Sequence, residues 1–351
     1  MKIIIINLLL INTIILAQNN IFDFNVDKRL FISYAFMNAA GNDAEWRKEG
    51  MDSIRIEVRR DLFSKIDSTF LKNIQLYVDN NHLESWTTFG PYALINDGPP
   101  NFNLRINFKE SNIDSNFVNK TKGLRKYFIE FYSKYDIEKL WNKYKSIIQK
   151  ENQEFEPYAS KALKDIIKYC RLDDNYYKDK TKKIYFQRIP IMLYYTMQTV
   201  KINGEIYIIS GPMGGKPSEA NFYHEALHYP IHELVKKYSK EVDNFSKLND
   251  LNKGKLGYQD WNSFFEECLV RAIDKILSAK LFNYNDSTLA KNIYDEYKIG
   301  ILLCPYFDEE LKKYEKTNLT LDEYFPKLLT NLDYNKEKKR LESFQSKKTV
   351  I

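Results

Sequence analysis

Residues 224–228, which read His-Glu-Ala-Leu-His, set the strictest condition on how this chain can fold. On an α-helix, side chains four residues apart lie one above the other on the same face. His224 and His228 can therefore offer two imidazole nitrogens to one metal ion. Such a spacing can arise by chance, but three of the four histidines of the chain fall within residues 224–232. We therefore predict a metal-binding helix with His224 and His228 as ligands.

Glu225 directly follows the first of these histidines and lies on the same side of the helix. A carboxylate there can take a proton from a metal-bound water and later deliver it to a leaving group. Zinc suits this chemistry because it lowers the pKa of its bound water to about 7 and polarises a substrate carbonyl. We therefore expect a zinc-dependent hydrolase with Glu225 as general base, acting on peptide or protein substrates. The alternatives are a zinc-bound scaffold without catalysis, and a zinc amidase acting on a non-peptide amide such as a cell-wall linkage.

A zinc hydrolase needs a third protein ligand besides the two histidines. His232 is one candidate, but Pro230 should end or kink the helix, so the simplest interpretation is a surface histidine. Glu266 and Glu267 are the others, because paired acids inside an apolar helix are costly unless one has a partner such as a metal ion. Helical periodicity mildly favours Glu266. That both glutamates face solvent stays open as the alternative.

A peptidase also needs a neutral donor for the oxyanion that forms during hydrolysis. Tyr223, Tyr229 and His232 are the candidates near the motif. The segment Glu205 to Ser210 is a candidate edge strand, along which an extended substrate could pair.

The pattern of apolar residues predicts an α+β fold that is mostly α, with a small β-sheet next to the motif helix. Helical spacing dominates before residue 180 and again after the loop Gly211-Pro212-Met213-Gly214-Gly215, where we expect a helix capped near Ser218. Between them, strand-forming residues and the hairpin signal Asn203-Gly204 predict a sheet. The expected strands are 184–186, 189–200 and 205–210, and the later helices are 231–243, 260–280, 286–302 and 306–314.

The N-terminal segment predicts export. Residues 1–17 combine a basic start, a short interrupted apolar core and a final alanine, as a signal peptide does; the alternative is a buried strand. We therefore expect a secreted or periplasmic protein. Residues 18–180 would form a helical N-terminal region, either separate or a lobe of the same domain. Residues 181–351 would form the zincin-like metallopeptidase region.

Charge and cysteine content exclude several classes of protein. The net charge of +6 comes from 53 basic and 47 acidic residues, which are interspersed, so we expect no nucleic-acid partner. No segment after the N-terminal one is long and apolar enough to span a membrane. Three cysteines, Cys170, Cys268 and Cys304, allow at most one disulfide, so the core must carry the stability.

The motif residues together resemble the gluzincin metallopeptidases, in which a His-Glu-x-x-His helix is followed by a glutamate on a later helix. More narrowly, the chain is similar to a family of secreted bacterial proteins named for DUF4932, a peptidase-like domain of unknown function. The resemblance rests on Arg29–Phe36 with Ala40–Asn42, on Phe131-Tyr132, on Tyr223–Pro230 and on Glu267–Ala272. It implies that the fold is zincin-like and that Glu267, rather than Glu266, joins His224 and His228 on the zinc ion. Pro230 follows the second histidine at a shorter spacing than is usual in the family.

Overall fold

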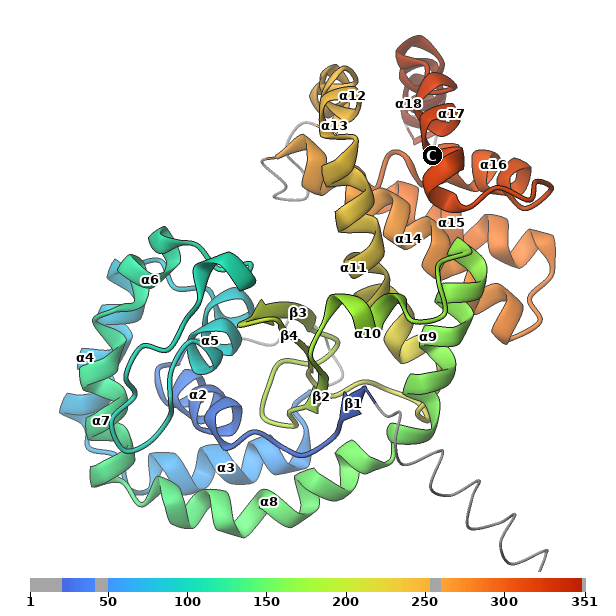
Figure 1. The fold of residues 1–351 in the computed structure, drawn as a ribbon. Coiled ribbons are helices and arrows are strands. Elements are labelled where there is room, and N and C mark those ends of the chain that lie inside the picture. Colours follow the sequence, from blue (N-terminus) through green and yellow to red (C-terminus); the bar gives the residue numbers. More distant parts are fainter. Residues whose placement is uncertain (1–20, 42–49, 253–259, 349–351) are drawn as a thin grey trace, which may run out of the picture. The chain divides into compact units, whose positions relative to one another are not determined.

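The chain folds into two compact units. The computed structural model describes residues 21–41, 50–252 and 260–348, so the predicted signal peptide at residues 1–17 lies outside the described part. One unit comprises Met1–Ser160 and Tyr177–Pro217, and the other comprises Lys161–Tyr176 and Ser218–Ile351. Helices predominate in both, with one small sheet among the described residues, as the mostly helical α+β class predicts (Figure 1).

The boundary between the units differs from the expected one at residue 180. The sheet belongs to the unit of the N-terminal helices, because its strands share a hydrophobic core with the helix α2 (Lys28–Ala39). The strands contribute Val200, Ile202, Tyr207 and Ile209 to this core. The motif helix belongs to the other unit.

The first unit is built around α2 (Lys28–Ala39), whose ten residues from Leu30 onward are all buried. The Asp27 side chain caps this helix by accepting from the backbone N–H of Arg29. Phe36 stacks on Phe128 with ring centroids 4.3 Å apart, which ties α2 to α7. The surrounding helices are α3 (Ser53–Phe63), α4 (Ser68–Asn80), α5 (Ser85–Leu94), η1 (Phe108–Glu110), α6 (Ser115–Thr121), α7 (Leu124–Lys134), α8 (Ile137–Gln153), the start of α9 (Glu156–Cys170) and most of α10 (Tyr176–Lys180).

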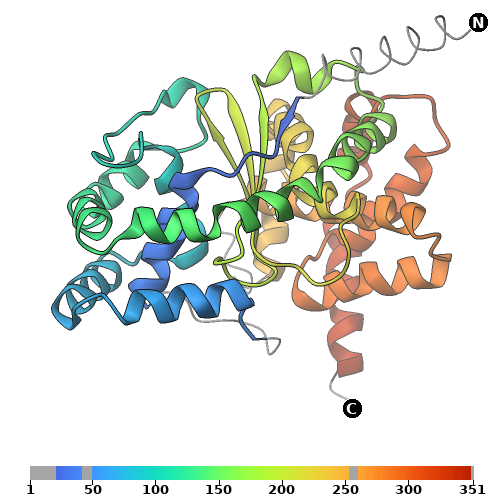
Figure 2. The same ribbon diagram turned by 90° about the horizontal axis from the view of Figure 1, so that it is seen from below.

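The sheet has four strands in the order β1-β2-β4-β3 (Figure 2). β1 (Phe22–Asp23) and β4 (Glu205–Ser210) both run parallel to β2 (Ile184–Arg188), and β3 (Met197–Ile202) runs antiparallel to β4. The predicted hairpin is confirmed: Asn203 and Gly204 join β3 to β4 with φ angles of 53° and 80°. The expectation that Glu205 to Ser210 is an edge strand is wrong, because β4 pairs with strands on both sides. β3 lies at that edge.

The predicted strand 189–200 begins only at Met197. The residues before it follow a different path because buried side chains bind their carbonyl groups. Asn38 Nδ2 donates to the carbonyl of Ile191 at 2.8 Å, and the fully buried Arg55 donates to the carbonyl of Met192 at 3.4 Å. Arg55 Nε also donates to Asn38 Oδ1 at 2.9 Å. These contacts satisfy buried backbone groups that a strand would pair with another strand.

The second unit is helical throughout its described residues. Its central pair is α11 (Ala220–Lys237) and α14 (Trp261–Leu281), which contribute a large share of the buried side chains of the unit. The predicted helices 260–280, 286–302 and 306–314 appear as α14, α15 (Asp286–Ile299) and α16 (Cys304–Tyr314). The predicted helix 231–243 is split between α11 and α12 (Ser239–Asp243). The unit also contains the end of α9, η2 (Ser246–Leu248), α13 (Asn249–Asn252), α17 (Leu321–Thr330) and α18 (Tyr334–Lys348).

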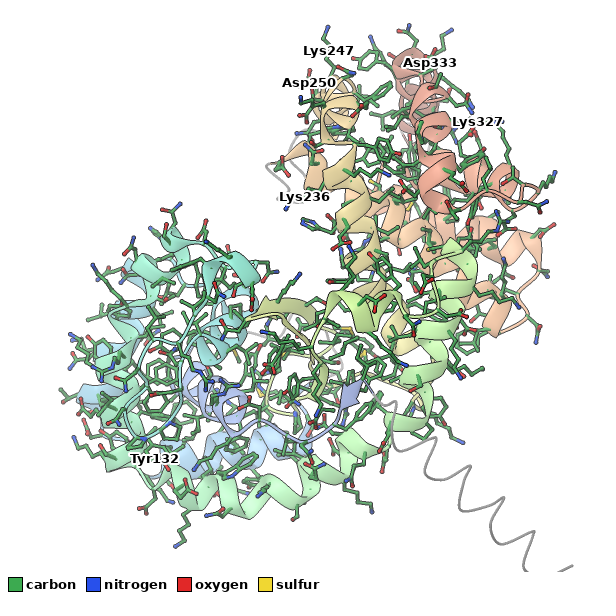
Figure 3. All side chains as sticks on the ribbon, in the orientation of Figure 1. Tyr132, Lys236, Lys247, Asp250, Lys327 and Asp333 are labelled. Carbon is green, nitrogen blue, oxygen red and sulfur yellow. The ribbon has the colours of Figure 1, made fainter. Side chains whose placement is uncertain are left out.

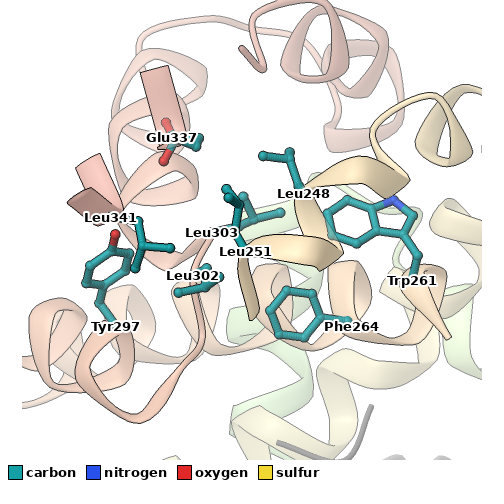
Figure 4. A pocket seen from close by; sticks show the side chains of 9 residues that line it. All are labelled: Leu248, Leu251, Trp261, Phe264, Tyr297, Leu302, Leu303, Glu337 and Leu341. Atoms are coloured by element: carbon teal, nitrogen blue, oxygen red, sulfur yellow. The ribbon is translucent and has the colours of Figure 1, made fainter. Parts of the chain in front are cut away.

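The C-terminal helix α18 is packed onto this unit through Glu337 and Leu341, which face a small apolar cavity (Figure 4). The cavity holds about 10 Å³, no more than one water molecule. Burial raises the pKa of Glu337, and Arg340 on the next turn pairs with its carboxylate at 3.0 Å. The other lining residues are Leu248, Leu251, Trp261, Phe264, Tyr297, Leu302 and Leu303.

Charged side chains such as Lys236 and Lys247 lie at the surface of this unit (Figure 3). In the described part of the chain, no helix has the length and apolar character needed to cross a membrane. Cys170, Cys268 and Cys304 are all buried and free, so none of them forms a disulfide.

Candidate metal centre

The motif helix α11 begins at Ala220, two residues after the expected cap at Ser218. Asn221 Oδ1 accepts from the backbone N–H of Ser218 at 2.7 Å, so this side chain fixes the turn that leads into the helix. Pro230, which was expected to end or kink the helix, does not end it: α11 continues through it to Lys237. Pro230 removes only one backbone hydrogen bond. The buried side chains of this helix, among them Leu227 and Ile231, hold its two halves in the core.

The structure brings His224, His228 and Glu267 together. Nε2 of His224 and Nε2 of His228 lie 3.3 Å apart. Oε2 of Glu267, on α14, lies 3.4 Å from Nε2 of His228, and Oε1 lies 3.8 Å from Nε2 of His224. One possible ligand atom from each residue falls within 4.8 Å of the others, so the group can hold a metal ion.

The spacing of these atoms fits one small cation. Zinc bonds to nitrogen and oxygen are about 2.0–2.2 Å long, so neighbouring ligand atoms on a tetrahedral ion lie about 3.3–3.5 Å apart. The separation of the two Nε2 atoms, 3.3 Å, and that of Oε2 of Glu267 from Nε2 of His228, 3.4 Å, fall in that range. The other carboxylate oxygen of Glu267, Oε1, lies 3.8 Å from Nε2 of His224. A set of two imidazoles and one carboxylate is also a donor set that suits zinc and leaves a fourth position open.

Glu266 faces the opposite nitrogen of the second histidine. Its Oε1 lies 2.9 Å from Nδ1 of His228, and its Oε2 lies 2.9 Å from Nδ1 of His232. The carboxylate accepts a hydrogen bond from Nδ1–H, which leaves the lone pair of Nε2 directed away from Glu266 and toward His224. The two adjacent glutamates therefore divide their contacts: Glu267 lies beside the Nε2 atoms, and Glu266 orients the ring of His228.

The charges of the site favour a bound cation. Burial raises the pKa of Glu267, but the hydrogen bond with His228 and the charges of His224 and Arg271 hold it well below its usual range. Burial likewise acts against ionisation of Glu266, and hydrogen bonds with His228 and His232 lower its pKa. Burial lowers the pKa of His228, but these carboxylates and Glu225 raise it to about 10. Both Glu266 and Glu267 are therefore anionic at neutral pH. His228 is protonated there without a metal, so an ion that binds its Nε2 displaces that proton.

Glu225 lies on α11 beside His224 and is buried, with 6% of its surface exposed. Its charge adds to the hydrogen bonds of Glu266 and Glu267, which raise the pKa of His228. A buried carboxylate next to two imidazoles is the arrangement that proton transfer at a metal site requires.

Comparison with protein-family models, with curated proteins and with solved structures found no match for this chain. The resemblance to gluzincins and to the DUF4932 family therefore stays a prediction from the motifs.

Of the three candidate oxyanion donors, His232 shares a partner with the histidine pair: Glu266 binds both His232 and His228. The side chain of His232 is 64% exposed. This exposure confirms the prediction of a surface histidine, and Glu266 also ties its ring to that of His228. Tyr223 is buried and its hydroxyl already donates to Asp165 Oδ2 at 2.7 Å. The ring of Tyr229 lies against that of Tyr176, with centroids 6.1 Å apart.

Arg271 and Glu296 are part of the site but were not singled out from the sequence. Arg271 Nε lies 2.5 Å from Oε1 of Glu267, and its Nη1 lies 2.7 Å from Oε2 of Glu296 on α15. The i to i+4 spacing of Glu267 and Arg271 on one helix was the available signal. Glu296 comes from a helix whose position no local pattern gives.

Proposed function

We propose that the second unit carries a zinc-dependent hydrolase site that cleaves peptide bonds, with Glu225 as the general base. The observation that carries this proposal is the convergence of His224, His228 and Glu267 within 4.8 Å, next to a buried glutamate on the same helix. A structural ion pair would not need the glutamate at position 225, whereas hydrolysis does.

His224, His228 and Glu267 would hold the ion through Nε2, Nε2 and a carboxylate oxygen. A zinc ion, when bound, supplies a Lewis acid that polarises a carbonyl group and makes a water molecule more acidic. The contribution of Glu266 is to keep the proton of His228 on Nδ1, so that Nε2 is available as a donor atom.

Glu225 performs the proton transfers in this proposal. Its carboxylate accepts a proton from the water whose oxygen adds to the peptide carbonyl carbon. The same proton then goes to the amine nitrogen as the carbon–nitrogen bond breaks, so that one water is consumed and a carboxylic acid and an amine are formed. His232, whose pKa is raised by its hydrogen bond with Glu266, would in its protonated form donate from Nε2 to the oxyanion. Tyr229 is the alternative, since the hydroxyl of Tyr223 already donates to Asp165.

The same geometry supports a zincin-like, gluzincin-type assignment within the proposal. The motif helix is followed along the chain by α14, which supplies a glutamate, as the resemblance implies for that class. The mixed sheet precedes the motif helix in the chain, with an antiparallel strand at its edge. Secretion and a peptide or protein substrate belong to the same proposal, and the signal-peptide motif supports the former.

The proposal is tested by incubating the purified mature protein with a peptide library and detecting cleavage products by mass spectrometry. We expect products from the zinc-loaded wild type, none after chelation, and recovery when zinc is returned. Glu225→Gln should keep its zinc and form no products, because the amide cannot accept the proton. Glu233→Gln is the matched control: this glutamate lies two turns further along α11 and binds Tyr176 instead, so activity should persist.

Two outcomes would overturn the proposal. Unchanged cleavage by Glu225→Gln would show that another group is the base. A zinc-loaded wild type that cleaves no peptide would remove the peptidase assignment and leave a binding scaffold or an amidase with another substrate.

A further inference from the structure

A chain of buried charges extends from Glu267 away from the histidines. Arg271 lies one turn after Glu267 on α14, and its Nε donates to Oε1 of Glu267 at 2.5 Å. Its Nη1 donates to Oε2 of Glu296 at 2.7 Å. Lys275, one turn further, binds Oε1 of Glu296 at 3.1 Å and Asp274 at 3.0 Å. One stripe of α14 thus carries Glu267, Arg271 and Lys275. Within it, Arg271 and Lys275 both bind a single carboxylate from α15, that of Glu296.

Because these groups are buried, each charge needs a partner of opposite sign. The side chains of Glu267 and Glu296 are only 5% and 11% exposed, and that of Arg271 is 28% exposed. A charge at such a depth is costly unless it is paired and hydrogen-bonded. Removing Arg271 would leave both Glu267 and Glu296 without this cation, whereas removing Lys275 would leave the contact between Arg271 and Glu267 intact.

Arg271 also distinguishes the two oxygens of Glu267. The guanidinium binds Oε1, which lies 3.8 Å from Nε2 of His224, whereas Oε2 lies closer to a histidine, at 3.4 Å from Nε2 of His228. A rigid guanidinium held at a second point by Glu296 fixes the rotation of the Glu267 carboxylate. Glu296 also offsets the positive charge of Arg271, which would otherwise oppose a cation at the histidines.

We propose that Arg271 and Glu296 are positioning residues of the metal centre, which hold Glu267 so that Oε2 is the oxygen offered to the ion. The inference rests on the proposed metal site and goes beyond it by assigning a role to two residues that touch neither metal nor substrate. As a consequence, the site is already organised before the metal binds, and Oε2 of Glu267 is left available for the ion.

Zinc affinity and the visible absorption spectrum of the cobalt-substituted protein test this assignment without relying on activity. Affinity would be measured by competition with a chromophoric chelator at constant pH and ionic strength. We expect Arg271→Met to bind zinc about 10–100-fold more weakly than the wild type. Its cobalt spectrum should change in position and intensity, because both oxygens of Glu267 become free to bind. Glu296→Gln should weaken zinc binding in the same direction.

Lys275→Met is the matched control, because Lys275 shares Glu296 and the same face of α14 but does not touch Glu267. It should lower the thermal stability of the metal-free protein while leaving zinc affinity and the cobalt spectrum as in the wild type. Arg271→Lys keeps the charge without the fork, so its affinity should fall between those of the wild type and Arg271→Met. If Arg271→Met does not fold, Arg271→Lys and Glu296→Gln test the positioning role in its place.

The two levels of the proposal fail in different ways. If the wild type binds no zinc, the proposed function fails. If the wild type binds zinc through His228 but Arg271→Met, Arg271→Lys and Glu296→Gln keep its affinity and cobalt spectrum, only the positioning role fails. Equal losses of affinity in Arg271→Met and Lys275→Met would likewise overturn it, since they would indicate a general effect on stability.

Discussion

Oε1 of Glu266 lies 2.9 Å from Nδ1 of His228. This contact selects the tautomer of the neutral, metal-binding imidazole, because the carboxylate accepts a hydrogen bond from Nδ1–H and leaves Nε2 as the donor atom. The neighbouring Glu267 meanwhile lies beside Nε2 of the same ring, at 3.4 Å. Two consecutive glutamates thus serve opposite nitrogens of one histidine.

The first prediction concerns this contact. Glu266→Ala should weaken zinc binding about 10–100-fold while the bound stoichiometry at saturating zinc stays at the wild-type value, because the ligand atoms remain. Glu266→Gln should lose less zinc affinity than Glu266→Ala, since its amide oxygen can still accept a hydrogen bond from Nδ1. Competition titrations measure both. Loss of all zinc from Glu266→Ala, with Glu267→Ala retaining it, would instead make Glu266 the ligand.

The second prediction links metal to stability. An ion that binds only the folded state stabilises it according to its concentration relative to Kd, by about 2.7 kcal/mol at a hundredfold excess. Calorimetric unfolding of the second unit should therefore shift to higher temperature with added zinc. His228→Ala is the control and should show no such shift. A zinc-independent transition in the wild type would contradict the prediction.

Pro230 gives a third prediction. Its position inside α11 costs a backbone hydrogen bond and strains the preceding turn. Pro230→Ala should restore an amide N–H and raise the free energy of unfolding by about 1–2 kcal/mol, after the loss of the buried ring is deducted. Zinc affinity should stay unchanged if the proline only adds strain. A drop in affinity would show that the proline shapes the spacing of the histidines.

The fourth prediction concerns the first unit. Arg55 is fully buried and donates to Asn38 and to the carbonyl of Met192. Arg55→Ala should lower the free energy of unfolding by about 2–5 kcal/mol, because partners in the core lose their donor and a cavity forms. Urea denaturation measures the change. Zinc affinity is the internal control, since His224, His228 and Glu267 all belong to the other unit.

The sequence predicted the elements that depend on local patterns. The helices of the second unit from α14 to α16 follow from apolar periodicity, and the Asn203-Gly204 turn follows from the need for positive φ at both positions. His224 and His228 needed only the geometry of one helix turn to be paired.

The structural features that could not be predicted from the sequence depend on contacts between distant segments. The stretch 189–196 has strand composition, yet Asn38 and Arg55 bind its carbonyl groups and keep it out of the sheet. Pro230 predicts a helix end or a kink, but α11 does not end there, because its tertiary packing outweighs one lost hydrogen bond. Periodicity favoured Glu266, and only the position of α14 against α11 separates the contacts of Glu266 from those of Glu267.

The metal centre is tested by the metal content of the purified mature protein, measured by mass spectrometry beside His228→Ala, Glu267→Ala and Glu266→Ala. We expect one zinc ion per chain in the wild type and in Glu266→Ala when zinc is saturating, and its loss from His228→Ala and Glu267→Ala. A wild type that takes up no zinc after incubation with it would contradict the metal centre, and with it the proposed hydrolase.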